Sequence, residues 1–344
     1  MEVFAMRKLG VLMLMASFAT TILANEPAQD MDYTLSGHAT SPFSLNPCYV
    51  GESNAYRAGL NYRMQWPKLE NEYRTMRLTY DQNFYKLVSS VGVHYVYDGQ
   101  AKDLKSHEMG LTYSHNIRVT EGHYVRLGLT AAVFIKKVGE DGYYGDQWQN
   151  GTTLDNSLED DNMKDKAVFP DFTFGAAYVM ENIFSAGFAI YHISAPRYGF
   201  VDDDGVELPR RYNFHVRYMH NLESSAGLWG NRGKAENYIM GTLNFQHQGE
   251  YNIGSINVGA FVSHMMLGVA YRHDFRDMEV DGVKYAKLNT VSFMIGGSYK
   301  GLQAYYTYDL FTSSKTNGSW SHEFSIVYAI APKHYRYSCP VVYW

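Results

Sequence analysis

Three features of the 344-residue chain predict its fold class, an all-β protein that forms a transmembrane antiparallel barrel of about fourteen strands. Apolar and polar residues alternate along segments of about ten residues, the length that a tilted strand needs to cross a bilayer. The chain opens with a segment typical of export, and no later stretch approaches the apolar length of a membrane helix. Short and long connections also alternate, as they do in outer-membrane barrels.

The first 24 residues predict a signal peptide. Arg7 and Lys8 supply positive charge, residues 9–23 form a short apolar core, and Ala24 is a small residue at the expected cleavage point. A buried N-terminal helix is the alternative. We therefore expect four parts: a signal peptide (1–24), a periplasmic N-terminal segment (25–54), an outer-membrane barrel (55–331) and a periplasmic C-terminal tail (332–344).

The alternation of side chains places fourteen strands. In residues 301–330, for example, Tyr306 and Leu310 share one side of a strand, whereas Thr307 and Asp309 share the other. A soluble β-sandwich is the alternative, but its strands average only about five or six residues. The predicted strands lie near 55–66, 72–81, 87–97, 105–117, 122–137, 171–180, 183–193, 211–221, 237–247, 252–262, 265–274, 288–299 and, for the last two, within 301–330.

The lengths of the connections predict which way the barrel faces. The long joints, 139–170, 194–210, 275–287 and 312–319, all follow odd-numbered strands, and 222–235 is a long joint that breaks the rule. Outer-membrane barrels have short periplasmic turns, long outer loops and an even number of strands. Both termini are therefore expected in the periplasm.

Composition limits the classes of partner. A net charge of −5 and a pI of about 6.2 give no basic surface for nucleic acid at the level of the whole chain. The 30 tyrosines suit the interface of a membrane, which favours rings with a polar tip, so outer-membrane lipid is an expected partner. The mean hydropathy of −0.32 does not argue against a barrel, because only alternate residues of a strand face lipid.

No catalytic signature stands out, so the sequence predicts no enzyme, cofactor or catalytic metal. His322 and Glu323 begin like a zinc-protease motif, but no second histidine follows and the segment has the pattern of a strand. Acidic stretches at 139–148, 159–165 and 202–205 are either hydrated loops or calcium ligands.

Charged residues on the polar side of the strands are expected to face the lumen. Charges of both signs indicate either an ion-pair network that fills the barrel or the lining of a selective pore. The residues are Arg57, Arg63, Arg77, Glu108, Arg217, Asp309 and Glu323.

The two cysteines, Cys48 and Cys339, lie just before the first predicted strand and just after the last. Closure of a barrel makes these strands neighbours, and the periplasm permits disulfides. A Cys48–Cys339 bridge is one hypothesis, and two separate thiols are the other.

Eight short motifs in order resemble one family, PorP/SprF. They are "QDMDYTLSGHATSPFSLNPCYVGE" (29–52), "YRMQW" (62–66), "FPDFTFGAAY" (169–178), "AIYHISAP" (189–196), "LGVAYR" (267–272), "YTYD" (306–309), "SHEFSIVY" (321–328) and Cys339-Pro340. Cys48 departs from the small residue usual in the family, and the ending "VVYW" also differs. The resemblance implies structural or partner roles for Asn46, Pro47, Gly51, Arg63, Gln65, Trp66, Asp309, Ser321, His322, Glu323, Cys339 and Pro340.

The resemblance also implies a function, that of a non-enzymatic outer-membrane component of the type IX secretion system. Such a protein is either the core component or a partner dedicated to one adhesin, and it meets periplasmic components of the machine. We expect cargo with a type IX C-terminal domain to bind the loops 139–170 and 194–210, or the tail 332–344 to dock to the machine. An outer-membrane channel or transporter for hydrophobic or small solutes is the alternative.

Overall fold

The computed structural model describes most of the predicted barrel and part of the segment before it. The predicted signal peptide and C-terminal tail, including Cys339 and Pro340, lie outside the described residues. The described residues are 32–36, 42–53, 55–67, 73–100, 104–138, 148–149, 153–154, 164–181, 183–200, 205–222, 237–276, 279–280, 283–284, 289–312 and 320–330.

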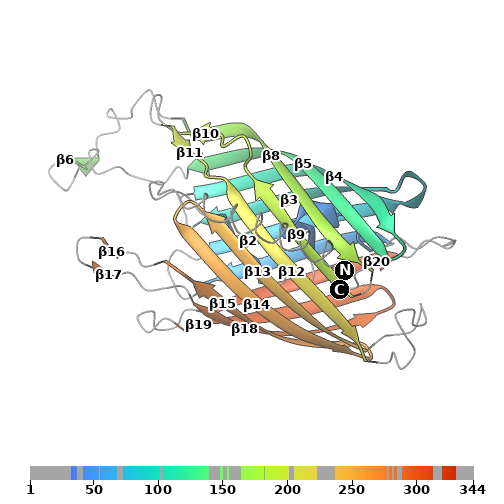
Figure 1. Ribbon diagram of the computed structural model, residues 1–344. Coiled ribbons are helices and arrows are strands. Elements are labelled where there is room, and N and C mark those ends of the chain that lie inside the picture. Colours follow the sequence, from blue (N-terminus) through green and yellow to red (C-terminus); the bar gives the residue numbers. More distant parts are fainter. Residues whose placement is uncertain are drawn as a thin grey trace, which may run out of the picture.

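Fourteen antiparallel strands form one closed barrel, in which each strand pairs with the next and the last pairs with the first (Figure 1). Every predicted strand overlaps one of them, so the predicted fold class is confirmed. The strands are β1 (Tyr56–Gln65), β2 (Tyr73–Phe84), β3 (Ser89–Gln100), β4 (Leu104–Thr120), β5 (His123–Val138), β8 (Lys166–Met180), β9 (Phe184–Tyr191), β12 (Arg211–Asn221), β13 (Tyr238–Gln248), β14 (Tyr251–Val262), β15 (Met265–Asp274), β18 (Thr290–Tyr299), β19 (Leu302–Phe311) and β20 (Trp320–Ile330).

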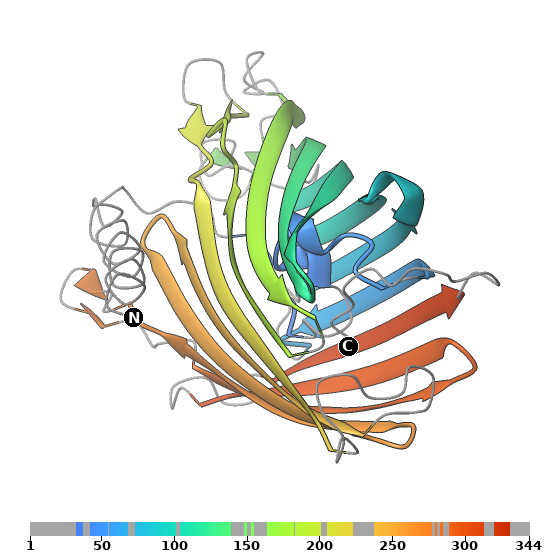
Figure 2. The same cartoon turned by 45° about the vertical axis from the view of Figure 1, so that its right-hand side comes forward.

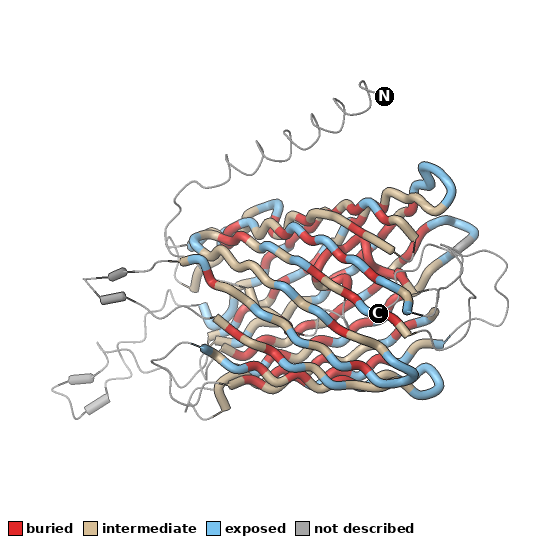
Figure 3. The backbone as a smooth tube through the Cα atoms, turned by 60° about the horizontal axis from the view of Figure 1, so that its bottom comes forward, coloured by how far each residue is buried: buried red, intermediate tan, exposed pale blue. Residues whose placement is uncertain are grey.

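Burial alternates along the strands, as the sequence pattern predicts (Figure 3). Phe324 and Ile326 of β20 point outward and are about half exposed, whereas Glu323 and Ser325, which alternate with them, are buried in the lumen. An outer surface of this kind, apolar on all sides, is stable only against lipid. No helix among the described residues has the length and apolarity to cross a membrane.

The two ends of the barrel differ in their connections. One end, the short-turn end, carries 85–88, 121–122, 181–183, 263–264 and 300–301, together with the longer 222–237. The other, the long-loop end, carries the four long joints that the sequence predicts. Two-stranded hairpins lie within three of these joints: β6 (Trp148–Gln149) with β7 (Thr153–Leu154), β10 (Arg197–Tyr198) with β11 (Val206–Glu207), and β16 (Glu279–Val280) with β17 (Val283–Lys284).

The described residues before β1, 32–36 and 42–53, lie inside the barrel and are called the lumen segment here (Figure 2). It contains two short 3₁₀ turns, η1 (Pro42–Ser44) and η2 (Pro47–Tyr49). Cys48, Tyr49 and Val50 are completely buried. The expectation that 25–54 extends into the periplasm is therefore wrong for these residues, because their apolar side chains are buried against the inner wall.

The lumen segment runs along the barrel from end to end. Asp32 meets Arg211 and Gln248, which lie at the long-loop end, and β1 starts at the short-turn end. Ile330, the last described residue, also lies at the short-turn end. Residues 32 and 330 thus lie at opposite ends of the barrel, and the prediction that both termini are periplasmic stays a prediction.

Candidate functional site

The lumen segment is held at its centre by Asn46 and Pro47, which start η2. Asn46 is the N-cap: its side-chain oxygen accepts a hydrogen bond from the Cys48 N–H (3.0 Å), and proline follows at the first helical position. The Asn46 amide also donates to the carbonyls of Phe188 (2.8 Å) and Ala176 (3.3 Å). One side chain thereby orders the turn and joins it to β8 and β9.

Gly51 lets the segment turn toward β1. Its φ of +63° lies in the left-handed region, and a Cβ would overlap the side chain of Ser90. The Gly51 N–H donates to the Asp81 carboxylate (2.9 Å), which also pairs with Arg57 (2.9 Å). Glycine is required here for both its backbone conformation and its lack of a side chain.

A buried ion pair ties the end of the lumen segment to β12. Glu52 contacts the guanidinium of Arg217, and each residue is only 1% exposed. The same guanidinium lies 4.0 Å from the centre of the Tyr49 ring, and the Tyr49 hydroxyl bonds to His215 (2.8 Å). Removal of either partner would leave an uncompensated charge in the lumen.

A second cluster gathers three of the predicted site residues around Ser36. Arg63 pairs with Asp309 (2.7 Å) and Glu323 (3.4 Å). The Ser36 N–H donates to Glu323 (2.7 Å), and its hydroxyl donates to Asp309 (2.7 Å). Residues from β1, β19 and β20 thus close the barrel and bind the lumen segment at the same point.

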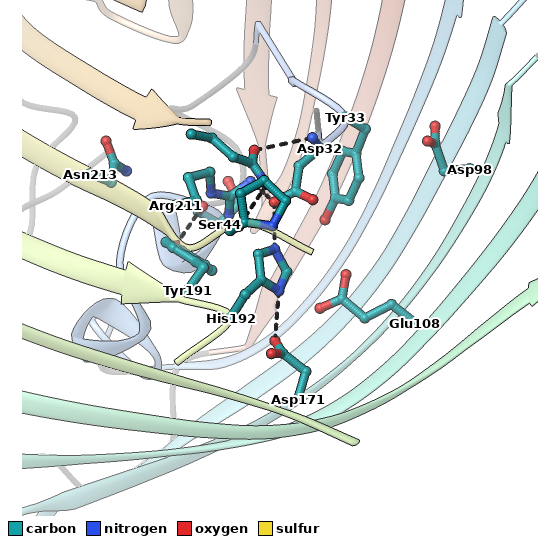
Figure 4. A network of polar contacts seen from close by, with 12 residues as sticks. Asp32, Tyr33, Ser44, Asp98, Glu108, Asp171, Tyr191, His192, Arg211 and Asn213 are labelled. Atoms are coloured by element: carbon teal, nitrogen blue, oxygen red, sulfur yellow. Dashed lines mark hydrogen bonds and ion pairs between the residues drawn. The ribbon is translucent and has the colours of Figure 1, made fainter. Parts of the chain in front are cut away.

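At the long-loop end, His192 lies between two carboxylates (Figure 4). One ring nitrogen contacts Asp32 of the lumen segment (2.8 Å) and the other contacts Asp171 (3.1 Å), while Arg211 also pairs with Asp32 (2.8 Å). Burial alone would lower the pKa of His192, but Asp32 and Asp171 raise it to about 9. Burial alone would raise the pKa of Asp32, but His192 and Arg211 hold it well below its usual value. These four residues form a charged latch.

The seven charged residues predicted to face the lumen all do so, and most have partners that the sequence could not show. Their arrangement as pairs supports the interpretation of an interior network over a pore lining. The contacts are Arg57–Asp81, Arg63–Asp309 and Arg63–Glu323, Arg77–Tyr33, Glu108–His94, and Arg217–Glu52.

The remaining predicted site residues are divided among several places. Gln65 and Trp66 lie at the rim of the long-loop end, and Ser321 is buried opposite Gln65 in the β1–β20 register. His322 points outward and bonds to the Tyr306 hydroxyl (2.7 Å) on the membrane-facing surface. The structure therefore does not join all of them into one site.

Cys48 is buried against β4 and β5 and forms no disulfide with another described residue. Burial raises its pKa to about 12, so the thiol stays protonated. Cys339 lies outside the described residues, and the bridge between them stays a prediction.

Sequence reasoning missed the lumen segment as the centre of the interior. A signal was present: Leu35, Phe43, Leu45, Tyr49 and Val50 are apolar, yet they follow neither a strand nor a helix period. A solvated extension cannot bury such apolar side chains, so they would not stabilise it. Among the described residues, no cluster of His, Cys, Asp or Glu is arranged to hold a metal. Most of the acidic stretches considered for calcium lie outside those residues.

Fold and interior together define a class: an outer-membrane β-barrel whose lumen holds the segment that precedes its first strand. The sequence model of the family described as "Type IX secretion system membrane protein PorP/SprF" matches residues 28–328. The chain belongs to this family and is an outer-membrane component of that secretion system.

Solved structures of other outer-membrane proteins resemble the barrel at low sequence identity. Omp33 of Acinetobacter baumannii has a TM-score of 0.45 at 9% identity, with 80% of this chain and 99% of that chain covered. The toluene transporter TodX of Pseudomonas putida has a TM-score of 0.47 at 8% identity, with 88% and 95% covered. No curated protein sequence matches the chain.

Proposed function

We propose that this protein is a non-enzymatic docking component that supports the export or surface attachment of proteins carrying a type IX C-terminal domain. Membership of the PorP/SprF family assigns the protein to the type IX secretion system. The observation that carries the docking role is the lumen segment, which crosses the barrel and is bonded to it at both ends and at its centre. Such a filled interior favours a rigid platform over a conduit for folded cargo.

The long-loop end is the face that this platform offers to cargo. Its joints contain most of the residues that connect one barrel strand to the next, and hairpin β10–β11 lies next to the inner wall at this end. Leu208 and Tyr198, from the joint that contains this hairpin, pack on the stacked rings of Phe134 and Phe169. A loop surface that is already ordered loses less conformational entropy when a partner binds.

The test compares the secreted and surface proteomes of the wild type and a clean deletion. Loss of all proteins with the type IX signal identifies a general core component, and loss of one large adhesin identifies a dedicated partner. Unchanged proteomes overturn the proposal and leave solute transport as the leading function.

Loop exchange tests where cargo binds. Replacing the joint between β5 and β8 by a short turn should release cargo to the medium while the barrel still assembles. The matched control shortens 222–237, a long joint at the opposite end. Full retention after the first exchange would contradict docking on these loops.

A further inference from the structure

The lumen segment leaves a cavity of about 260 Å³ at the long-loop end. We call this cavity the vestibule. Thr34 of the lumen segment forms one side, and the barrel supplies Trp66, Tyr73, Tyr251, Arg272 and Phe311. Except for Thr34, these residues lie at or near strand ends at the long-loop end, so the vestibule opens on the same side as the proposed docking surface.

Three rings form a corner of the vestibule. Trp66 lies 5.2 Å from Tyr73, centroid to centroid, with the rings almost perpendicular (86°), and 5.7 Å from Phe311 at 52°. Each ring is partly exposed. Walls of aromatic rings set at an angle attract cations, because the ring faces carry negative charge. We call Trp66, Tyr73 and Phe311 the aromatic corner.

The backbone of Trp66 is held in an uncommon conformation to place its indole there. Its φ of 56° lies in the left-handed region, which a bulky residue rarely adopts and which is concentrated at functional sites. The Trp66 N–H is bonded to the carbonyl of Trp320 (3.0 Å), which fixes this conformation. This conformation ends β1 and leaves the indole beside the rings of Tyr73 and Phe311.

Two other aromatic rings at this end of the lumen each have an arginine guanidinium stacked on them. Arg211 lies over Tyr191 (3.8 Å), and Arg276 lies over Tyr251 (4.0 Å) on the far side of the vestibule itself. Within the described part of the chain, no cation lies over a ring of the aromatic corner. Among the described residues, the corner thus presents the same kind of ring face as these stacks with no basic side chain over it.

We propose that the aromatic corner binds a lysine or arginine side chain from a basic segment of the secreted partner. The joints at the same end contain the acidic stretches 139–148, 159–165 and 202–205, and a negative surface concentrates basic segments. This inference deepens the proposed function and rests on it, because it names the chemistry by which the docking surface recognises cargo.

The first test measures cargo retention in cells that carry Trp66→Phe, Trp66→Leu or Trp320→Leu. Phenylalanine keeps an aromatic face, so retention should stay near the wild-type level. Leucine keeps apolar bulk without that face, so the affinity for cargo should fall about 3- to 30-fold. Trp320→Leu is the matched control, since this side chain points away from the lumen. Retention by Trp66→Leu, or equal loss by both Trp66 variants in folded barrels, overturns the proposal.

The second test needs no cargo and separates this inference from the proposed function. The full-length protein is labelled with 5-fluorotryptophan at its 5 tryptophans, and the Trp66 signal is assigned from Trp66→Phe. A capped Gly-Arg-Gly peptide should shift the Trp66 ¹⁹F signal selectively, whereas Gly-Glu-Gly should not. Equal shifts with both peptides, or none at tens of millimolar peptide, overturn cation binding even if the deletion strain loses surface proteins.

Discussion

Glycines on two walls of the barrel show how differently the lumen is filled. On β5 and β8, the lumen segment occupies the space beside inward-facing glycines: Cys48 lies against Gly128, and Asn46 lies against Gly175. On β14 and β15, Gly259 and Gly268 are cross-strand partners, and the nearest side chains belong to Met266 and Met294 of the barrel itself.

Inward-facing glycines therefore occur in two kinds of interior, one filled by the lumen segment and one filled by side chains of the barrel itself. The first wall, called the packed wall here, comprises β2–β5, β8, β9 and β12, and polar side chains from five of these strands, β2, β4, β5, β9 and β12, bond to the backbone of the lumen segment. Ser114 donates to the Cys48 carbonyl (2.9 Å), and Asn213 donates to that of Leu45 (2.6 Å). The second, called the self-filled wall, is the part of β13–β15, β18 and β19 near the short-turn end, where methionines and tyrosines of the barrel pack on one another. Methionine adapts to irregular space, whereas hydrogen bonds to a backbone demand one position.

The largest expected effect comes from breaking the buried pair on the packed wall. Glu52→Ala removes the carboxylate that pairs with the buried guanidinium of Arg217, so the free energy of unfolding should fall by about 3–5 kcal/mol. Urea unfolding followed by tryptophan fluorescence measures it. Glu250→Ala, at an exposed turn, is the control and should change stability by less than about 0.5 kcal/mol. A cost for Glu52→Ala as small as that of the control would show that the packed wall does not depend on this pair.

The latch gives the packed wall a stability that depends on pH between about 6.5 and 9. The folded pKa of His192, about 9, exceeds the unfolded value of 6.5, so its contribution is complete below pH 6.5 and is lost as the pH rises through 9. This contribution of His192 to the free energy of unfolding is of the order of 3 kcal/mol. Asp32 acts in the opposite direction. Because its folded pKa lies below its unfolded value, the stability that it contributes is complete above about pH 4 and is lost in acid.

The measurement is protection of the lumen segment from hydrogen exchange between pH 6 and pH 10, corrected for intrinsic exchange rates. Protection near Asp32 should fall across this range in the wild type and stay nearly level in His192→Asn. Asparagine suits the left-handed backbone at this position, where φ is 56°. An identical pH profile in both proteins would argue against the latch.

A smaller effect distinguishes the two walls directly. A Cβ at Gly128 would overlap the backbone of Pro47 and Cys48, whereas a Cβ at Gly268 would make ordinary contacts of 3.4 Å or more. Gly128→Ala should therefore cost about 1–3 kcal/mol and loosen the lumen segment, and Gly268→Ala should be nearly neutral.

Maleimide labelling of Cys48 in a Cys339→Ser background reports the loosening. The buried thiol should react slowly in the parent and in Gly268→Ala, and faster in Gly128→Ala. Equal rates in all three proteins would mean that the two walls tolerate added volume alike. The intact mass of the unsubstituted protein under non-reducing conditions also tests the Cys48–Cys339 bridge, because a bridge lowers the mass by two hydrogens.

Epitope tags should have the smallest effect on stability, and they test most directly at which end of the barrel each part of the chain lies. A tag after Pro27 adds to the chain just before Asp32, which lies at the long-loop end, and a tag after Ala331 follows β20 at the short-turn end. If the long loops face outward, antibody should bind the first tag on intact cells and not the second. Binding to neither tag, with binding to a control tag in 313–319, would contradict this path of the chain.

The alternation of side chains along the chain was enough to predict the barrel, its fourteen strands and the inward charges. Alternation of side chains is a local property, and closure follows because every strand must pair in a membrane. It did not determine the partners of those charges. Arg217 meets Glu52 across 165 positions, and Arg63 meets Glu323 across 260.

Only the tertiary structure decided where the residues before β1 lie. No period marks the lumen segment, since its side chains fit the inner surface of strands far away in sequence. Asn46 and Gly51 could be recognised as turn residues, but their partners on β8, β9 and β2 come together only when the barrel closes. The aromatic corner depends on closure in the same way, because Trp66 and Phe311 become neighbours once β1 pairs with β20.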